Sequence, residues 1–237
     1  MWSFTPIGYV RGGFAERFGV PRQARLAPDV PARIEIVPPY NRREAWQGLD
    51  QFSHVWLVFG FHAVRDEQWK PTVRPPRLGG KQRMGVFATR SPHRPNHLGL
   101  SAVTLAGIEL GEGKVALTVR GADMIDGTPI FDVKPYVPYA DAIPDAKGGW
   151  ANDVPQPKLR VQLTAAALDQ CRKYDAEYAA HVPLRRVIEQ IIALDPRPAI
   201  DSDEVGGEYG MHFQRWDVRW RVTGDRVEVY EIVEIPK

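Results

Sequence analysis

Residues 68–108 concentrate side chains that could bind an anion. This interval, called the basic segment below, contains seven Lys or Arg residues and two His residues but no Asp or Glu, whereas the whole chain has a formal net charge of only +2. Arginines on short fixed loops bind phosphate, carboxylate or nucleotide groups through the planar guanidinium. The alternative is a solvated basic surface whose charges form structural ion pairs. The composition therefore predicts an anion site without naming the ligand.

Several common catalytic motifs are absent from the sequence. Residues 78–82 (LGGKQ) lack the spacing and the hydroxyl residue of a phosphate-binding P-loop. No G-x-G-x-x-G follows a predicted strand, and no G-x-S-x-G is present. His93 and His97 have a metal-ligand spacing, but Pro95 prevents a regular helix and no other ligand cluster is nearby, so no metal site is predicted. Simple hydrolase, kinase and Rossmann dehydrogenase functions lose their usual support.

Two further stretches carry polar groups in patterns that suit a binding site. Residues 20–23 (VPRQ) place two polar donors after a rigid proline, which indicates either a ligand-lining loop or a plain surface turn. His62 follows an apolar run and precedes the basic segment, although a histidine at a strand end is more often structural. Asp132, Lys134 and Tyr136 share one face of a predicted strand by period two, which predicts a small site or an exposed face.

The elements that must position these residues are mainly strands. Proline and glycine recur through the basic segment and predict two stiff loops around one short strand at 84–89. The run 55–61 (VWLVFGF) is short, β-branched and aromatic, so we predict a buried central strand. Further strands are predicted at residues 6–10, 33–37, 98–108 with a candidate bulge at Gly99, 114–120 and 131–136. Residues 41–49 predict a helix, with Asn41 as a candidate N-cap.

A change of composition at residues 140–159 predicts a linker between two domains, 1–145 and 160–237. The second domain is predicted to hold helices at 164–180, with Thr164 as a candidate cap, and at 183–194, followed by a hairpin of strands 214–222 and 226–233. The single cysteine, Cys171, excludes an internal disulfide and fits a reducing cytoplasm. No apolar run approaches the length of a signal peptide or a membrane span, so we expect a cytoplasmic protein without a membrane partner.

Several motifs, met in order along the chain, carry a resemblance to a known family. They are residues 20–23 (VPRQ), 52–56 (FSHVW), 74–76 (RPP), 83–92 (RMGVFATRSP), 94–96 (RPN), 98–101 (LGLS) and 126–129 (DGTP). Together they resemble the TsaA-like family over about residues 7–139, and the match continues through 195–199 (DPRPA) and 216–220 (WDVRW). The resemblance implies a mainly β fold, with an N-terminal β-barrel that binds a cofactor and a small C-terminal α/β domain.

Bacterial members of this family methylate N6 of threonylcarbamoyl-adenosine next to the tRNA anticodon, with S-adenosylmethionine as the methyl donor. The resemblance therefore implies this cofactor, tRNA as a partner and a homodimer. Carried over position by position, it implies cofactor contacts at Pro21, Arg22, Gln23, His62, Ala63, Arg90, Leu100, Ile125, Asp126, Gly127 and Thr128. Some relatives have Gln where this chain has Ala63, so a backbone contact would survive there and a side-chain contact would not.

The implied reaction requires help at the nitrogen, because an N6 conjugated to a carbamoyl group is a poor nucleophile and benefits from a base or a hydrogen-bond acceptor. Asp126 and Asp132 are candidate acceptors, and Lys134 and Tyr136 are candidate orienting groups. The threonyl carboxylate and the tRNA phosphates need cations. The candidates are Arg74, Arg77, Lys81, Arg83 and Arg94. Unpaired anticodon-loop bases stack on aromatic side chains such as Trp69 or Tyr136.

Two other functions are compatible with the residues. One is a non-catalytic RNA-binding or cofactor-sensing module, because no general base is obvious. The other is a methyltransferase of the same fold that acts on a small molecule. Turnover on tRNA separates the first from an enzyme, and methyl transfer in RNA-free extracts would support the second.

Overall fold

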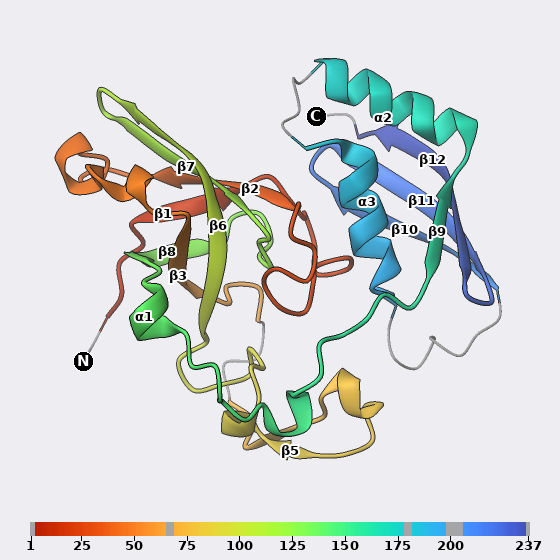
Figure 1. The fold of residues 1–237 in the computed structure, drawn as a ribbon, viewed down its shortest axis with the longest axis horizontal. Helices are drawn as coiled ribbons and strands as arrows, with labels where there is room; N and C mark the ends of the chain where they lie inside the picture. Colours follow the sequence, from red (N-terminus) through yellow and green to blue (C-terminus); the bar gives the residue numbers. More distant parts are fainter. Residues whose placement is uncertain (1–2, 65–68, 178–181, 198–205, 236–237) are drawn as a thin grey trace. The chain divides into compact units, whose positions relative to one another are not determined.

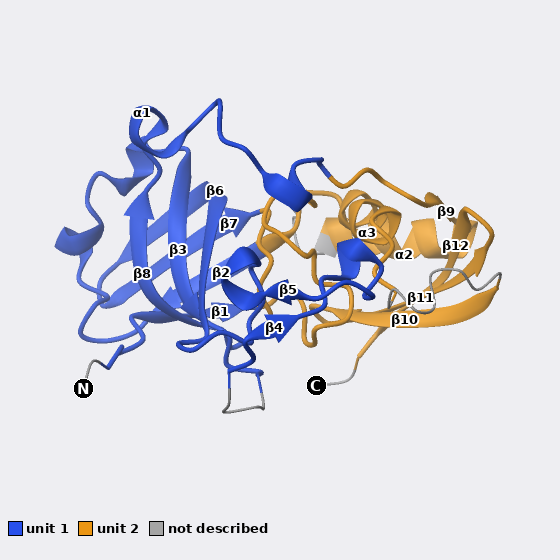
Figure 2. Ribbon diagram, turned by 90° about the horizontal axis from the view of Figure 1, so that it is seen from below, with its two compact units in different colours: residues 1–11, 32–120, 127–154 blue, residues 12–31, 121–126, 155–237 orange. Residues whose placement is uncertain are grey.

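The fold is taken from a computed structural model that describes residues 3–64, 69–177, 182–197 and 206–235. Two compact units divide the chain (Figure 2). The barrel unit comprises Met1–Arg11, Ala32–Arg120 and Gly127–Val154, and the C-terminal unit comprises Gly12–Pro31, Gly121–Asp126 and Pro155–Lys237. Two earlier segments, Gly12–Pro31 and Gly121–Asp126, therefore join the unit that holds the C-terminal third of the chain. The predicted domain limits, 1–145 and 160–237, stay a prediction.

The barrel unit contains a closed six-stranded barrel with the strand order β1-β2-β7-β6-β3-β8 (Figure 1). Its strands are β1 (Gly8–Arg11), β2 (Pro31–Ile36), β3 (His54–Gly60), β6 (Leu98–Gly111), β7 (Lys114–Arg120) and β8 (Pro129–Pro135). In β3 the side chains of Val55, Leu57 and Phe59 are buried and alternate with half-buried ones, as a strand with one face in the core requires. The predicted mainly β fold, with a barrel followed by a smaller α/β domain, is confirmed.

Gly99 shows how closely the strands of the barrel approach one another. It lies directly opposite Phe59 in the β3–β6 pair, and a Cβ at this position would lie 2.2 Å from Cζ of the Phe59 ring. The predicted bulge at Gly99 is wrong, because the β3–β6 register is continuous there. The irregularity of β6 lies between Leu105 and Gly107, in the pairing with β7. The glycine instead makes room for the aromatic ring of the neighbouring strand.

We expect Gly99→Ala to reduce the free energy of unfolding by about 1–3 kcal/mol or more, because the new methyl group must displace a buried ring. Gly85→Ala is a matched control, since no atom lies within 4 Å of a Cβ built at Gly85. This control should change the free energy by less than about 0.5 kcal/mol. Urea unfolding of both variants measures the difference, and equal values would contradict the account of Gly99.

The connections of the barrel unit are made of short elements. They are η1 (Arg43–Trp46), η2 (Leu49–Gln51), β4 (Thr72–Val73), η3 (Pro76–Leu78), β5 (Met84–Gly85), η4 (Val86–Ala88), α1 (Pro138–Asp141) and η5 (Gly149–Ala151), where η denotes a 3-10 helix. The predicted helix at 41–49 is wrong: η1 and η2 replace it, because Gly48 adopts φ +86° between them. Asn41 is not an N-cap; its amide donates to the Gly113 carbonyl at 2.5 Å. The predicted strand at 84–89 is reduced to β5 and followed by η4.

The C-terminal unit has a four-stranded sheet of order β10-β11-β12-β9 and two helices. Its elements are β9 (Arg160–Leu163), α2 (Ala165–Glu177), α3 (Leu184–Ala193), β10 (Gly207–Phe213), β11 (Trp216–Thr223) and β12 (Arg226–Glu234). Thr164 caps α2 as predicted, because its hydroxyl accepts the Ala167 N–H at 3.2 Å. Four parts of the predictions lie outside the described residues. They are the end of the predicted helix at 178–180, Pro198 and Ala199 of the motif at 195–199, and Gln68 at the start of the basic segment. Within the described ranges, no helix is long and apolar enough to cross a membrane.

Residues 12–31 complete the core of the C-terminal unit. Phe14, Ala27 and Val30 are almost fully buried in one cluster with residues of α3 and of strands β10 to β12. The Phe14 ring packs edge-on against Phe213 with 5.2 Å between centroids, and the Phe14 backbone forms isolated bridges to both Phe213 and Ile125. The loop that carries residues 20–23 is therefore anchored to the sheet of this unit.

Cys171 lies in the same core and is chemically shielded. Burial raises the pKa of its thiol to about 12, and the nearby carboxylates of Asp175 and Glu189 act in the same direction. At pH 8 the folded chain therefore holds a protonated thiol, whereas the thiolate is the reactive form. We expect a thiol-disulfide reagent to modify one thiol per chain in urea and almost none in buffer. Rapid modification of the native protein, with circular dichroism unchanged, would contradict this.

Candidate cofactor and RNA site

The loop with Pro21, Arg22 and Gln23 is held by its own hydrogen bonds and by the core beneath it. Pro21 is buried, and the Gln23 amide donates to the Arg22 carbonyl at 2.6 Å. The Arg25 N–H donates to the Gly121 carbonyl at 2.9 Å, which joins the loop to the segment before Ile125. Partial burial lowers the pKa of the Arg22 guanidinium, and the Asp195 carboxylate offsets part of this effect. Arg22 is exposed, so its guanidinium is accessible to an anion.

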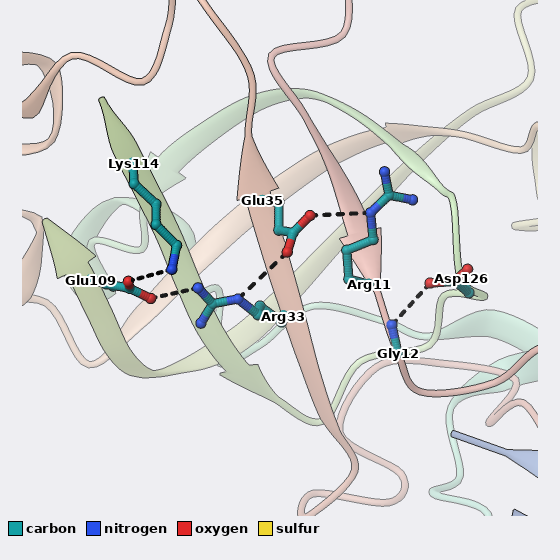
Figure 3. A network of polar contacts seen from close by, with 7 residues as sticks. All are labelled: Arg11, Gly12, Arg33, Glu35, Glu109, Lys114 and Asp126. Carbon is teal, nitrogen blue, oxygen red and sulfur yellow. Dashed lines mark hydrogen bonds and ion pairs between the residues drawn. The ribbon is translucent and has the colours of Figure 1, made fainter. Parts of the chain in front are cut away.

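The turn at 125–128 is closed from both sides by the chain near β1. The Gly12 N–H donates to Oδ1 of Asp126 at 2.9 Å (Figure 3). The Asp126 N–H donates to the Phe14 carbonyl at 2.8 Å. Gly127 has φ +74° and donates its N–H to the Val10 carbonyl at 2.9 Å. The exposed Asp126 carboxylate therefore has one oxygen occupied by a backbone donor. This contact assigns it a role in shaping the turn.

The barrel unit brings several of the predicted site residues together. A Cβ built on Gly127 would lie 3.8 Å from Nε2 of the exposed His62. Leu100 and Asp132 each lie directly opposite Val58, one on each side of β3. Directly opposed residues point to the same face of a sheet, and two strand spacings put their backbones about 10 Å apart. Leu100 is 55% exposed, so this outer face offers an apolar surface next to a carboxylate.

Tyr136 lies apart from the turn at 125–128. Its N–H donates to the His54 carbonyl at 3.0 Å, whereas His62 follows the opposite end of β3. A seven-residue strand is roughly 20 Å long, so Tyr136 and His62 are separated by that length. The Tyr136 ring packs against Trp56 with 5.6 Å between centroids. Asp132 and Lys134 form an exposed ion pair at 3.2 Å on the strand between these two ends.

Three of the five predicted RNA contacts donate hydrogen bonds within the barrel unit. Arg77 donates to the carbonyls of Ala151 and Asp153 at 3.4 and 2.5 Å, and Arg83 donates to the Thr72 hydroxyl at 2.9 Å. Arg94 donates to the carbonyls of Thr89 and Ser91 at 3.3 and 3.5 Å. These partners are neutral, so each guanidinium keeps its full charge while its loop is fixed. Arg74, Lys81 and Arg90 are exposed.

A chain of alternating charges crosses the outside of the barrel and was not predicted. Arg11 pairs with Glu35 at 3.3 Å, Glu35 with Arg33 at 3.8 Å, and Glu109 with Arg33 and Lys114 at 2.5 and 3.0 Å (Figure 3). Hydrogen bonds from Arg33 and Lys114 lower the pKa of the Glu109 carboxyl. Because opposite charges alternate along this surface, it offers little net attraction for a polyanion.

Two further features concern the candidate acceptor Asp132 and the question of a metal site. A recess of about 610 Å³ in the barrel unit is lined by Tyr40, Trp46, Phe52 and Asp132 among others, so the candidate acceptor Asp132 borders it. Among the residues that the structure describes, no three His, Cys, Asp or Glu side chains are grouped so that they could hold a metal ion. His97 uses its Nδ1 in a 2.8 Å hydrogen bond with the Pro92 carbonyl.

Comparison with known families accounts for both units. The model of the tRNA-methyltransferase O N-terminal domain matches residues 9–142, and that of the TrmO C-terminal domain matches residues 156–235. The chain belongs to the tRNA-methyltransferase O family. This confirms the resemblance that the motifs carry in both domains.

Full-length relatives share this organisation. The tRNA (adenine(37)-N6)-methyltransferase of Escherichia coli is 40% identical over 232 residues, which cover 98% of this chain and 97% of that protein. A Pseudomonas aeruginosa protein, named for S-adenosylmethionine-dependent methyl transfer, is 46% identical over 218 residues, covering 92% and 91%. The crystal structure of TrmO from Pseudomonas aeruginosa superposes with a TM-score of 0.82 at 39% identity and covers 98% of both chains. The similarity therefore includes both domains of each relative.

Proposed function

We infer that this chain is an S-adenosylmethionine-dependent methyltransferase that methylates N6 of adenosine 37 in tRNA. The observation that carries the inference is the match of both domains to one family, together with full-length identity of 40% to a tRNA (adenine(37)-N6)-methyltransferase. At the finer level, we propose that the acceptor is the threonylcarbamoyl form of this adenosine. Its carboxylate gives the cations of the basic segment a group to bind.

The residues present fit the cofactor chemically. The exposed guanidinium of Arg22 suits its carboxylate, and the exposed Leu100 suits the face of its adenine ring. Gly127 adopts a left-handed conformation and has no side chain. A ligand can therefore approach the backbone of this turn closely. We propose that these residues bind it together with Pro21, Gln23, His62, Ala63, Arg90, Ile125, Asp126 and Thr128. When bound, S-adenosylmethionine supplies an electrophilic methyl group on a sulfonium centre.

The protein must then position the nucleophile and remove its proton. With the methyl group supplied by the bound cofactor, N6 would lose its proton to an acceptor of this chain. We propose Asp132 as this acceptor, because it shares the outer face of the barrel with Leu100. Lys134 holds the Asp132 carboxylate in its 3.2 Å ion pair, and Tyr136 orients the RNA beyond it. Asp126 is the second candidate acceptor.

Asp126→Asn and Asp126→Ala separate the turn-closing role of this residue from an acceptor role. Asn keeps an oxygen for the Gly12 N–H, whereas Ala removes it. A hydrogen bond to a charged group contributes about 1.5–3 kcal/mol, so Ala should weaken cofactor binding roughly 10- to 100-fold. Asn should stay close to the wild type in both cofactor affinity and turnover. If Asn loses turnover as completely as Ala, the ionised carboxylate is required and Asp126 is the acceptor.

The proposal also includes the contacts of basic residues with the RNA and the oligomeric state. We propose that Arg74, Arg77, Lys81, Arg83 and Arg94 attract tRNA phosphates or the threonyl carboxylate, with Arg77, Arg83 and Arg94 also fixing their loops. We also propose a homodimer in the cytoplasm. Sedimentation at micromolar concentration tests the assembly, and a monomer would contradict it.

The proposed function is tested by calorimetric titration with S-adenosylmethionine, followed by incubation of the protein with labelled cofactor and total tRNA. We expect saturable cofactor binding and label in the RNA fraction. Binding without transfer to any tRNA would favour a cofactor-sensing module. Transfer to RNA-free extract alone would indicate a small-molecule substrate.

A further inference from the structure

An exposed pair of aromatic rings stands within the basic segment of the barrel unit. Phe87 is 71% exposed and Trp69 is 47% exposed, and their rings are nearly parallel, with 28° between planes and 6.3 Å between centroids. Large apolar side chains exposed side by side mark interaction surfaces, because folding normally buries them. We call Trp69 and Phe87 the aromatic pair.

The backbone that carries Phe87 is fixed by hydrogen bonds. Val86, next to Phe87, is 1% exposed, and its N–H donates to the Pro71 carbonyl at 3.0 Å. The Thr89 hydroxyl donates to the Val86 carbonyl at 2.8 Å, and the Trp150 indole donates to the Ala88 carbonyl at 3.0 Å. The 3-10 turn η4 is therefore held from several sides, while the Phe87 side chain points away from the core. A rigid exposed ring binds with little loss of conformational entropy.

The charges around the pair indicate what it binds. The basic segment has no acidic residue, and Lys70, Arg83 and Arg90 are close to the pair in sequence and exposed. Aromatic faces among cations suit single-stranded nucleic acid, because bases stack on rings while phosphates pair with Lys and Arg. This surplus of positive charge favours an anionic partner over an uncharged apolar peptide.

We propose that Phe87 and Trp69 form a stacking platform for an unpaired base of the RNA substrate. The proposal rests on the proposed function and deepens it, since it assigns the base contact to Trp69 together with Phe87 and not to Tyr136, whose ring packs against Trp56. Stacking on an aromatic ring is tolerant of base identity. The platform therefore contributes affinity for an open loop and discriminates against duplex RNA.

The test uses the full chain and an anticodon stem–loop RNA with 2-aminopurine in its loop, whose fluorescence falls on stacking. We expect Phe87→Ala and Trp69→Ala to weaken binding roughly 5- to 100-fold and to restore fluorescence, while a duplex RNA binds as before. The salt dependence should keep its slope, because no charge is removed. Phe87→Trp should retain binding, and Phe87→Leu should lose it despite similar apolarity. Tyr139→Ala is the matched control, since Tyr139 is 93% exposed but lies outside the basic segment.

Three outcomes would overturn the proposal. The first is unchanged loop affinity in Phe87→Ala, and the second is an equal loss in Tyr139→Ala. The third is a change of oligomeric state in Phe87→Ala, which would make the pair a contact between copies. Methyl transfer by the wild-type protein is measured in parallel. If the wild type methylates tRNA and Phe87→Ala binds the loop equally well, only the stacking platform is contradicted. If loop binding depends on Phe87 but the wild type transfers no methyl group, only the proposed activity is contradicted.

Discussion

Phe14→Ala should destabilise the C-terminal unit by about 3–5 kcal/mol, the usual cost of removing a buried aromatic ring. Phe14 is fully buried and packs edge-on against Phe213, so its loss leaves a cavity between residues 12–31 and the sheet. The same loop carries Pro21, Arg22 and Gln23. We therefore expect cofactor affinity to fall together with stability. Urea unfolding followed by Trp fluorescence, and calorimetric titration with S-adenosylmethionine, measure the two effects.

Val233→Ala is the control for Phe14→Ala, because Val233 lies in the same unit and is 40% exposed. It should change the free energy of unfolding by less than about 0.5 kcal/mol and leave cofactor binding intact. If Phe14→Ala lost stability but bound the cofactor with wild-type affinity, the loop would not depend on the C-terminal core for its position. That result would contradict the structural role given to residues 12–31.

Asp132→Asn should lower turnover by roughly 10²- to 10⁴-fold, the usual contribution of a positioned proton acceptor. The amide is nearly the same size and keeps an oxygen for the Val133 N–H, so the strand should stay intact. Cofactor affinity should be unchanged, because the substitution acts on the proton and not on binding. Single-turnover transfer of labelled methyl to tRNA, with saturating cofactor, measures the loss.

Two further variants complete the Asp132 experiment. Lys134→Met removes the partner of the 3.2 Å ion pair and should reduce turnover less than Asp132→Asn, since the carboxylate remains. Glu109→Gln alters an exposed carboxylate of the charge network on the barrel and should leave turnover unchanged. Wild-type turnover in Asp132→Asn would show that another group accepts the proton, and Asp126 would be the next to test.

The strands could be predicted because their patterns are local. β3, β7, β11 and the hairpin between β11 and β12 follow from alternation and turn residues alone. Two predictions failed for different reasons. Gly48 divides a helix-like stretch into two 3-10 turns, and this glycine is a local signal against one continuous helix. Phe59 requires a glycine opposite it where a bulge was predicted, and this contact between strands is not visible in a single stretch of sequence.

The residues of the candidate site could be predicted from the sequence, but some of the contacts that position them could not. The family motifs select the residues of the cofactor site, and the structure brings Gly127 beside His62 and aligns Leu100 with Asp132 across Val58. The association of residues 12–31 with the C-terminal core could not be predicted, because it pairs segments about two hundred residues apart. The charge of the basic segment was plain in the sequence. Only the hydrogen bonds of Arg77, Arg83 and Arg94 show that part of that charge also braces loops.

The most direct test of the assigned activity is mass spectrometry of tRNA before and after incubation with the purified protein and S-adenosylmethionine. The tRNA should come from cells that lack this activity, so that adenosine 37 starts unmethylated. We expect one added methyl group, mapped to N6 of threonylcarbamoyl-adenosine at position 37, and no other change. If the protein binds the cofactor and the tRNA but position 37 keeps its original mass, the assignment is wrong.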